Sequence, residues 1–369
     1  MRLLPQGLTP RQRTVLFLVG IGSMLVAFTN TLFTQTVAFA ADEFGVSNSA
    51  QGLGSAVVRW GIVISLPLVT LADMRGRRGV IVALAWTAPV VCAVGAVAPN
   101  FPFLVATQTF GRPLGLTLDV LLAVLVIEEM PADSRAQSTG VLAVLAGLGA
   151  GVAVAALPLA DMSVSSWRWI YALSLVWLPV AFVISRKLPE SARFTRQERG
   201  LARHLSGAAR NGLTRNLGRI CTVVFLTNIF IATMSIFQNR YLKDTRGYSA
   251  LLVALFTAAT SSPAAVGLVV GGRVADERGR RLLGAVMTPV GAVLLAGSFA
   301  VHGSLMWILA ILGAVALGLA YPAMAVYRGE LFPTHQRGLA GGLIMTSSLI
   351  GGSIGLVGAG RAVDAGHSY

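Results

Sequence analysis

Eleven long apolar stretches recur along this 369-residue chain and set the strongest limit on how it can fold. Each stretch has about twenty residues, the length that a helix needs to cross a hydrocarbon layer of roughly 30 Å. The stretches are continuous and do not alternate between apolar and polar residues, which argues against membrane strands. Charged residues make up only 12% of the chain, too few to cover a water-soluble domain of this length. The sequence therefore predicts an all-α polytopic membrane protein.

The expected spans are separated by short loops and by one long basic loop. The first span is followed by "AFAAD", which is similar to a signal-peptidase site, but its apolar stretch is too long for a signal peptide. An uncleaved first helix is therefore expected. The predicted bounds of the eleven spans are 14–41, 50–72, 79–98, 101–127, 137–160, 166–185, 218–239, 249–272, 282–302, 304–327 and 338–360.

Lysine and arginine are distributed unevenly between the loops. If the N-terminus lies inside, the N-terminal tail and the even-numbered loops hold 22 of the 29 basic residues, and the odd-numbered loops hold five. This bias predicts a cytoplasmic N-terminus in the cell membrane. Arg240, Lys243 and Arg246 run against it. The net charge of +14 is therefore explained by the membrane topology. No nucleic-acid partner is expected, because aromatic residues do not interleave with the basic ones.

Two charged phrases occur twice in the chain at nearly the same offset. "ADMRGRRG", which contains Asp73, returns as "ADERGRRL", which contains Asp276, 203 residues later. The pattern Glu-x-x-Pro-x-x-x-Arg begins at Glu128 and again at Glu330, 202 residues later. Two independent phrases that share an offset indicate duplicated halves. The predicted parts are a first six-helix bundle at 1–185, a cytoplasmic linker at 186–217 and a second bundle at 218–369.

The two halves resemble the major facilitator superfamily, because each carries Asp-x-x-Gly-Arg-Arg in the loop after its second span. The second copy fits the superfamily pattern well. The first departs from it at Val69, where a glycine is expected, and at Met74, where a basic residue is usual. The resemblance implies two pseudo-symmetric six-helix bundles and transport by alternating access. The duplication predicts a partner for the span at 166–185, so a twelfth span is expected to be missing from this sequence.

The resemblance also implies a gate on the cytoplasmic side, where acids and arginines pair between neighbouring helices and cap helix N-termini. Such pairs would form in the outward-open state and break on closure. Alternatively, the arginines only anchor loops and set topology. The candidate gate residues are Asp73, Arg77, Arg78, Glu128, Arg135, Glu190, Arg193, Asp276, Arg280, Arg281, Glu330 and Arg337.

Three charged residues stand out within the predicted spans, because a charge near the middle of a membrane costs on the order of 3 kcal/mol and is usually functional. These are Arg59, Arg112 and Asp119. Arg112, followed by Gly115, is similar to an arginine of the fourth span that handles protons or substrate in many superfamily members. It is the candidate partner of a substrate anion or of a proton site. Asp119 is the candidate proton carrier, or it faces a wet vestibule and pairs with an arginine.

Uncharged polar residues in the first, fourth, seventh and tenth spans could line the same cavity, or each could bond to a neighbouring helix. The candidates are Asn30, Gln35, Asn228, Gln238 and Tyr321. Small residues in other spans predict close helix approach. These are the pairs Gly147 and Gly151, Gly267 and Gly271, and Gly351 and Gly355.

The sequence favours a transporter of a small organic solute, with proton-coupled symport of a sugar or metabolite as the first hypothesis. "PESARF", which contains Glu190, and the doubled Glu-x-x-Pro-x-x-x-Arg resemble such symporters. A proton-coupled drug-efflux antiporter is the alternative, although the Gly-Pro dipeptide typical of its fifth span is missing. An enzyme is not expected, because no zinc or phosphate-binding motif occurs. No cofactor or metal is expected, and the protein is expected to act as a monomer in the lipid bilayer.

Overall fold

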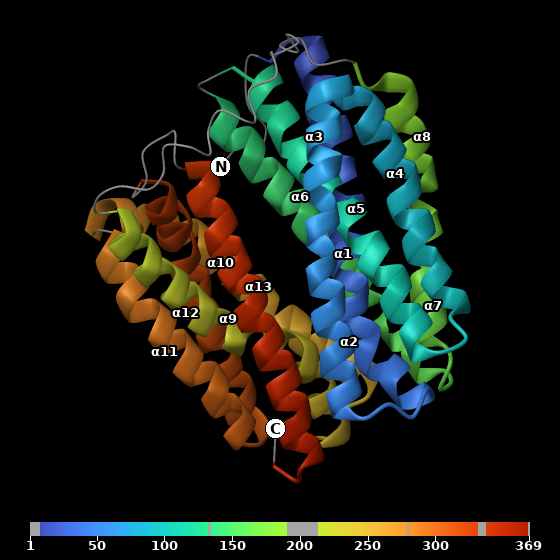
Figure 1. Cartoon of the computed structure of the whole chain (residues 1–369), viewed down its shortest axis with the longest axis vertical. Coiled ribbons are helices and arrows are strands. Elements are labelled where there is room, and N and C mark those ends of the chain that lie inside the picture. The colour runs from blue at the N-terminus through green and yellow to red at the C-terminus, as the bar shows by residue number, and fades with distance from the viewer. Residues whose placement is uncertain (1–7, 132–133, 190–212, 279, 331–336, 368–369) are drawn as a thin grey trace. The chain divides into compact units, whose positions relative to one another are not determined.

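The computed structural model describes residues 8–131, 134–189, 213–278, 280–330 and 337–367, and within them every regular element is a helix (Figure 1). Short 3-10 turns connect several of the α-helices. The elements are α1 Pro10–Glu43, α2 Asn48–Trp60, η1 Gly61–Ile64, α3 Ser65–Arg75, α4 Arg77–Val94, η2 Gly95–Val97, α5 Phe101–Glu129, α6 Arg135–Ala155, η4 Leu157–Asp161, α7 Trp167–Ala172, η5 Leu173–Trp177, α8 Leu178–Lys187, α9 Leu213–Asp244, α10 Ala250–Arg278, α11 Arg280–Ala300, α12 Gly303–Glu330 and α13 Arg337–Asp364.

Eleven helical segments of the described chain are long and apolar enough to cross a membrane. They coincide with the eleven predicted spans, so the all-α polytopic prediction is confirmed. Some spans combine several elements. The span Asn48–Ala72 contains α2, η1 and most of α3, and Trp167–Lys187 contains α7, η5 and α8.

Side-chain caps fix where several helices begin. Thr9 and Gln12 form a capping box at the start of α1, in which each side chain bonds to the backbone N–H of the other residue. Ser47 accepts a hydrogen bond from the backbone of α2, and Asn100 accepts one from the backbone of α5. These side chains satisfy N–H groups that have no partner within the first helical turn.

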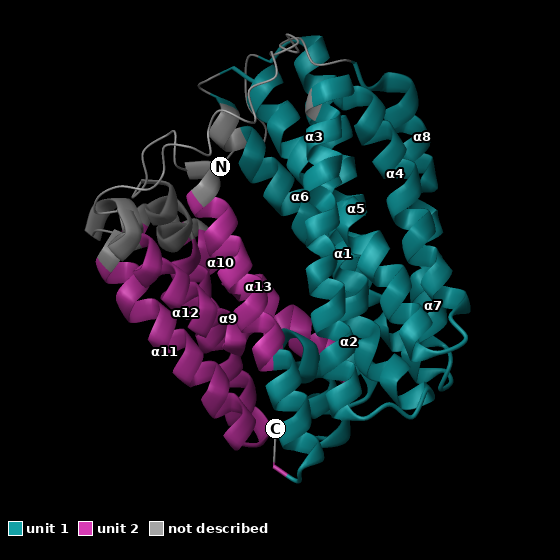
Figure 2. Ribbon diagram, viewed as in Figure 1, with its two compact units in different colours: residues 1–198, 235–251, 356–366 teal, residues 199–234, 252–355, 367–369 magenta. Residues whose placement is uncertain are grey.

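The chain divides into two compact units (Figure 2). Unit 1 contains Met1–Glu198, Ser235–Leu251 and Leu356–Gly366. Unit 2 contains Arg199–Met234, Leu252–Gly355 and His367–Tyr369. The end of α9 and the end of α13 therefore belong to the same compact unit as the first eight α-helices.

The core of unit 1 is built around α1, which packs against α5, α6 and α8. Val15, Leu18 and Leu25 of α1 are buried in one apolar cluster with Leu122 of α5 and Ile184 of α8. This tight packing gives unit 1 a rigid frame. The polar side chains within its spans are therefore held in place by that frame.

Three predictions of close helix approach have different outcomes. In unit 2, Gly267 and Gly271 of α10 meet the backbone of α12, and Gly351 and Gly355 of α13 meet the backbone of α9, as predicted. In α6, a methyl group on Gly147 or Gly151 would meet no described atom within 4 Å. Gly149 makes the close approach instead, because a methyl group there would lie 2.1 Å from the carbonyl oxygen of Met24 in α1.

Candidate functional site

The first copy of the repeated charged phrase lies at the junction of α3 and α4. Gly76 separates the two helices with a φ of 102°, a backbone conformation that favours glycine. The reversal places Arg77 and Arg78 in the first turn of α4. Arg77 forms an ion pair with Glu128 near the end of α5, so the structure brings together the two phrases that repeat in the sequence.

Arg78 binds the end of α8. Its Nε donates to the carbonyl oxygen of Leu188 at 2.6 Å, and its Nη2 donates to that of Ser185 at 2.9 Å. Carbonyl groups in the last turn of a helix have no partner within the helix, and a cation there also meets the negative end of the helix dipole. The planar guanidinium suits this double contact, and Arg78 thereby joins α4 to α8.

The other predicted gate residues are only partly described. The helical backbone holds Asp73, Arg135, Asp276, Arg280, Arg281, Glu330 and Arg337, but their side chains lie outside the described part of the structure. Glu190 and Arg193 lie outside the described residues altogether.

The three charged candidates, Arg59, Arg112 and Asp119, lie on two neighbouring helices of unit 1. Arg59 is half-buried near the end of α2, and Arg112 is half-buried near the middle of α5. Asp119 is exposed on the surface of the protein. Among the described residues, neither Arg112 nor Asp119 forms a hydrogen bond or an ion pair, so the structure does not pair them with each other.

The uncharged candidates do not converge on one point. Gln35 of α1 accepts a hydrogen bond from Asn239 of α9 at 3.0 Å. Asn228 donates to the carbonyl oxygen of Val224 in its own helix, and Tyr321 of α12 is 66% exposed. Asn30 and Gln238 are half-buried. The buried side-chain oxygen of Asn30 accepts no hydrogen bond from the described residues.

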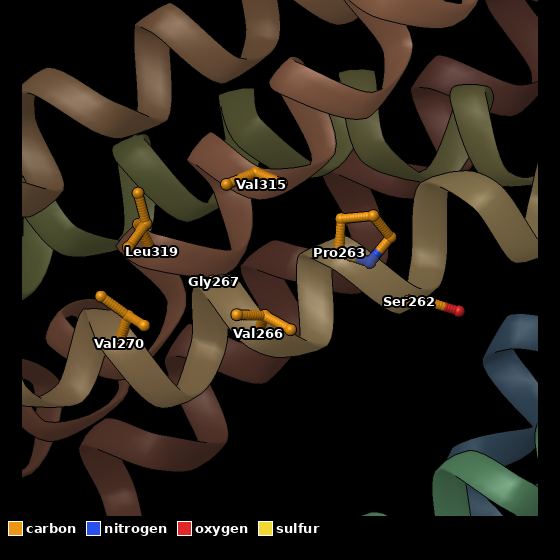
Figure 3. Close-up of a pocket in the computed structure, with 7 residues that line it drawn as sticks. All are labelled: Ser262, Pro263, Val266, Gly267, Val270, Val315 and Leu319. Atoms are coloured by element: carbon orange, nitrogen blue, oxygen red, sulfur yellow. The ribbon is translucent and has the colours of Figure 1, made fainter.

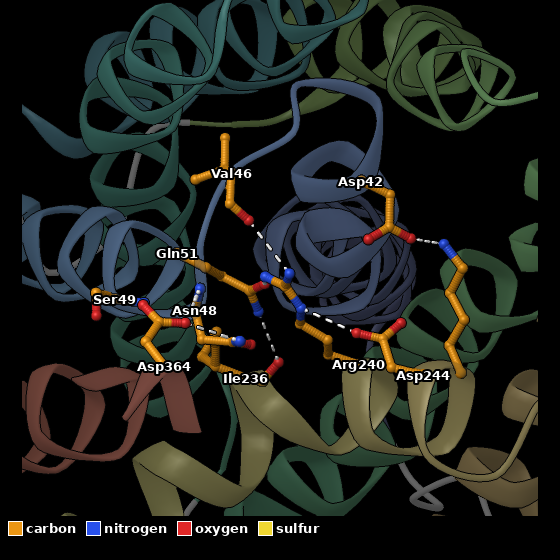
Figure 4. Close-up of polar contacts among 10 residues, drawn as sticks. Asp42, Val46, Asn48, Ser49, Gln51, Ile236, Arg240, Asp244 and Asp364 are labelled. Atoms are coloured by element: carbon orange, nitrogen blue, oxygen red, sulfur yellow. Dashed lines mark hydrogen bonds and ion pairs between the residues drawn. The ribbon is translucent and has the colours of Figure 1, made fainter. Parts of the chain in front are cut away.

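A second group of polar contacts, which the sequence interpretation did not identify, lies at the opposite end of α1 from the Arg77 phrase (Figure 4). Its centre is Arg240 of α9, which is buried. Arg240 donates from Nη1 to Oε1 of Gln51 at 2.7 Å and from Nη2 to the carbonyl oxygen of Val46 at 3.2 Å, and it pairs with Asp244. The amide of Gln51 donates to the carbonyl oxygen of Ile236 at 3.4 Å.

Lys243 extends this group, which we call the Arg240 cluster. Lys243 forms an ion pair with Asp42 of α1, and its ammonium lies 5.1 Å from the centre of the Phe39 ring. Two of the three basic residues that oppose the charge bias therefore have acidic partners. The third, Arg246, donates to the hydroxyl of Tyr241 at 2.7 Å. In the sequence, the only indication of the Arg240 cluster was that these basic residues run against the charge bias of the loops.

Two carboxylates bind the N-termini of helices at the same end. Asp364, at the end of α13, accepts hydrogen bonds from the backbone N–H groups of Asn48 at 3.0 Å and Ser49 at 2.8 Å in α2 (Figure 4). Asp161 accepts bonds from the backbone of Ala250 and Leu251 at the start of α10. A carboxylate is favoured in this position by the helix dipole and by the unpaired N–H groups.

The connection after α1 is fixed by a third ion pair. Glu43 pairs with Arg168 at 2.9 Å and accepts a hydrogen bond from the indole of Trp167 at 2.5 Å. Arg168 also donates to the carbonyl oxygens of Ala96 and Ala98. These contacts join three connections between spans at this end of unit 1.

An apolar recess of 580 Å³ lies on unit 2, between α10 and α12 (Figure 3). It is lined by Ser262, Pro263, Val266, Gly267, Val270, Val315 and Leu319. Ser262 is its only polar lining residue, so the recess offers almost no hydrogen bonding to a polar solute. Among the described residues no group of histidines, cysteines and acids could hold a metal ion.

The fold and these buried polar groups define a multi-pass helical membrane protein with charged residues in its spans. The sequence model of the Major Facilitator Superfamily matches residues 19–356, and the chain belongs to that family of transporters. Comparison with curated proteins gives no match.

Solved structures with the same fold include several transporters. A bacterial homolog of the human lysosomal transporter Spinster has a TM-score of 0.77 and 18% identity, over 97% of this chain and 84% of that one. The xylose transporter XylE from E. coli has a TM-score of 0.72 and 18% identity, over 95% and 89%. The nucleoside transporter NupG has a TM-score of 0.76 and 10% identity, over 95% and 92%.

Proposed function

We propose that this protein moves a small organic solute, of the sugar or metabolite class, across the cell membrane by proton-coupled symport. In this proposal the N-terminus is cytoplasmic, the protein acts as a monomer, and alternating access exposes one solute site to each side in turn. The structurally similar proteins include a xylose and a nucleoside transporter, which supports this class of solute.

The observation that carries the proposal is the position of Arg112 and Asp119 on α5. Both lie within one 29-residue span, and neither pairs with another described residue. A charge that faces hydrocarbon is expensive, so an exposed carboxylate in a span is expected to border water. An aqueous path along this face of α5 is what a transporter needs, whereas a purely structural helix bundle has no use for it.

The contacts at the two ends of unit 1 supply candidate latches. Arg77 and Glu128 form the latch on the proposed cytoplasmic side, and the Arg240 cluster with Lys243 and Asp42 forms the one on the opposite side. An ion pair that forms in only one state biases the protein towards that state. The Arg240 cluster links the helices of the first repeat to the end of α9, and Asp364 links α2 to the end of α13.

Uptake into proteoliposomes tests the proposal. The full chain is reconstituted, a pH gradient with acid outside is imposed, and a panel of radiolabelled sugars, sugar acids and nucleosides is offered. We expect accumulation of at least one solute above its external concentration, and loss of accumulation when a protonophore collapses the gradient. Solute uptake at the same level with and without the pH gradient would contradict proton coupling. Toxin resistance in cells that express the protein, without uptake of any panel member, would instead identify an efflux antiporter.

A further inference from the structure

We infer that Asp161 and Asp364 are a pair of latches, related by the internal repeat, which hold the end of unit 1 that carries the Arg240 cluster and open together. The inference rests on the proposed function, because alternating access requires each end of the protein to open in turn. It is carried by the repeated sequence around the two contacts, by their exposure to solvent, and by the helices that they hold.

The two contacts occupy equivalent positions in the two halves of the chain. Asp364 follows Asp161 by 203 residues, and Ala250 follows Asn48 by 202, which are the offsets of the repeated charged phrases. In each contact one carboxylate oxygen accepts from the first N–H group of a helix and the other oxygen accepts from the second. The contact is therefore a property of the repeated unit and not of one local sequence.

The turn before each capped helix is repeated as well. Gly45 and Gly247, 202 residues apart, have φ of 61° and 65°, a left-handed conformation that favours glycine. A serine follows two residues later in both copies, at Ser47 and Ser249. The same turn thus presents the first N–H groups of α2 and of α10 to a carboxylate.

The backbone of α13 lies directly against the start of α2, and this approach positions Asp364. A methyl group on Gly360 would lie 2.4 Å from the carbonyl oxygen of Asn48, and one on Gly52 would lie 2.2 Å from that of Leu356. Asp364 follows Gly360 by four residues, about one helical turn, so it lies on the same face of α13. Its carboxylate therefore meets the N-terminus of α2 (Figure 4).

Both carboxylates are exposed, whereas the guanidinium of Arg240 is buried. When an exposed contact breaks, water takes the place of each lost partner, so the energetic cost is small. A buried contact that breaks leaves a charged group unsatisfied. The two carboxylates can therefore release their helices and bind them again, as a latch requires.

Each latch holds one end of a helix whose other residues belong to unit 2. Ala250 and Leu251 of α10, and α13 from Leu356 onward, are part of unit 1, and the rest of both helices is part of unit 2. If the helices of the second repeat move against those of the first, as alternating access requires, the same motion strains both latches. They are therefore expected to open in one step.

Concerted opening differs in a measurable way from two independent helix caps. If both latches are closed in one state and open in the other, weakening either one shifts the shared equilibrium and exposes the N–H groups of both helices. If each carboxylate only stabilises its own helix, weakening it frays that helix alone.

Hydrogen exchange of the purified full chain in detergent at pH 7 tests the inference without requiring transport. The readout is the exchange rate of the N–H groups in the first turns of α2 and α10. The variants are Asp161→Asn and Asp364→Asn, because an amide keeps the size of the side chain but offers one acceptor oxygen and no charge. Arg361→Gln is the matched control, since Arg361 is an exposed charge in the last turn of α13.

In Asp161→Asn we expect exchange at the start of α10 to accelerate roughly fivefold or more, as for loss of a capping side chain. Exchange at the start of α2 should accelerate by a similar factor, and Asp364→Asn should give the reciprocal result. Arg361→Gln should exchange like the wild type. The N–H groups in the middle of α1 should stay protected in all three variants, because the core of unit 1 remains folded.

The inference is overturned if each variant accelerates exchange only at the helix that its own carboxylate binds, or at neither helix. Loss of protection in α1 also counts against it, because the carboxylates would then hold the fold and not a latch. These outcomes are distinct from a failure of the proposed function. Coupled exchange without uptake into proteoliposomes would refute transport alone, and uptake with independent exchange would refute the paired latch alone.

Discussion

Arg240 donates a 2.7 Å hydrogen bond to Gln51, although the two residues are 189 positions apart in the chain. The guanidinium is buried, and its other contacts are with Val46 and Asp244. A buried charge keeps its place only while its partners remain, because loss of one partner leaves it unsatisfied. Loss of this contact is therefore expected to destabilise unit 1.

Arg240→Gln is expected to open the end of unit 1 that holds the Arg240 cluster. The shorter, uncharged side chain cannot reach Val46 and Asp244 together, so the contact between α9 and the start of α2 weakens. We expect a membrane-impermeant maleimide to label Gln238→Cys several times faster in this variant. The background carries Cys221→Ser, because Cys221 is half-buried and Cys92 is fully buried.

Arg246→Gln is the matched control, since Arg246 donates to Tyr241 five residues before it. Labelling in the control should equal that in the parent. Equal rates in Arg240→Gln and Arg246→Gln would mean that Arg240 does not hold this end closed.

Arg78→Lys is expected to loosen the end of α8. Lysine carries the same charge but cannot reproduce the fork that binds the carbonyl groups of Ser185 and Leu188. We expect a loss of about 1–2 kcal/mol in stability and faster hydrogen exchange at the end of α8. The control is Arg75→Lys, because Arg75 is exposed. Indistinguishable exchange in the two variants would show that charge alone suffices.

Gly61→Ala is expected to push η1, which directly follows α2, away from α5. The new methyl group would lie 2.3 Å from the backbone carbonyl oxygen of Thr109, which cannot rotate away as a side chain could. Overpacking of this kind costs about 1–3 kcal/mol. The melting temperature, Tm, should therefore fall. Gly79→Ala, at a site where a methyl group meets no atom within 4 Å, should leave Tm unchanged. An unchanged Tm in Gly61→Ala would show that the surrounding structure accommodates the methyl group without cost.

Asp119→Asn is expected to abolish accumulation driven by a pH gradient, since an amide cannot carry the proton. Exchange of labelled for unlabelled solute, which needs no net proton movement, should persist. Asp119→Glu keeps the acid and should retain accumulation in part. Uptake in a pH gradient by Asp119→Asn at the wild-type rate would remove Asp119 from the coupling mechanism.

The spans could be predicted from sequence because each depends on a local property. Apolar length alone identifies a membrane helix, so all eleven predicted spans coincide with helices of that length. The pairing of Arg77 with Glu128 had a signal as well, because both belong to phrases that occur twice. The contact of Arg78 with the end of α8 had none, since backbone carbonyl groups leave no mark in a sequence.

The Arg240 cluster could not be predicted, because its partners are distant in the chain. Arg240 binds Gln51 across 189 positions and Val46 across 194. Arg240 and Lys243 were exceptions to the charge bias of the loops. Their positions are explained only by the packing of α9 against the loop after α1. In α6 the prediction of a close helix approach at a glycine was correct, but the residues were wrong. Gly149, and not Gly147 or Gly151, lies on the face towards α1.

Pro113 lies four residues after Thr109, so its ring nitrogen cannot donate to the Thr109 carbonyl group as a helical N–H would. That same oxygen is where Gly61 of η1 approaches. A Cα–H group of the glycine can make a weak contact with it. The middle of α5 thus lacks one helical hydrogen bond, directly beside Arg112. A helix bends most easily where such a bond is missing, so α5 can change direction beside Arg112 without unfolding.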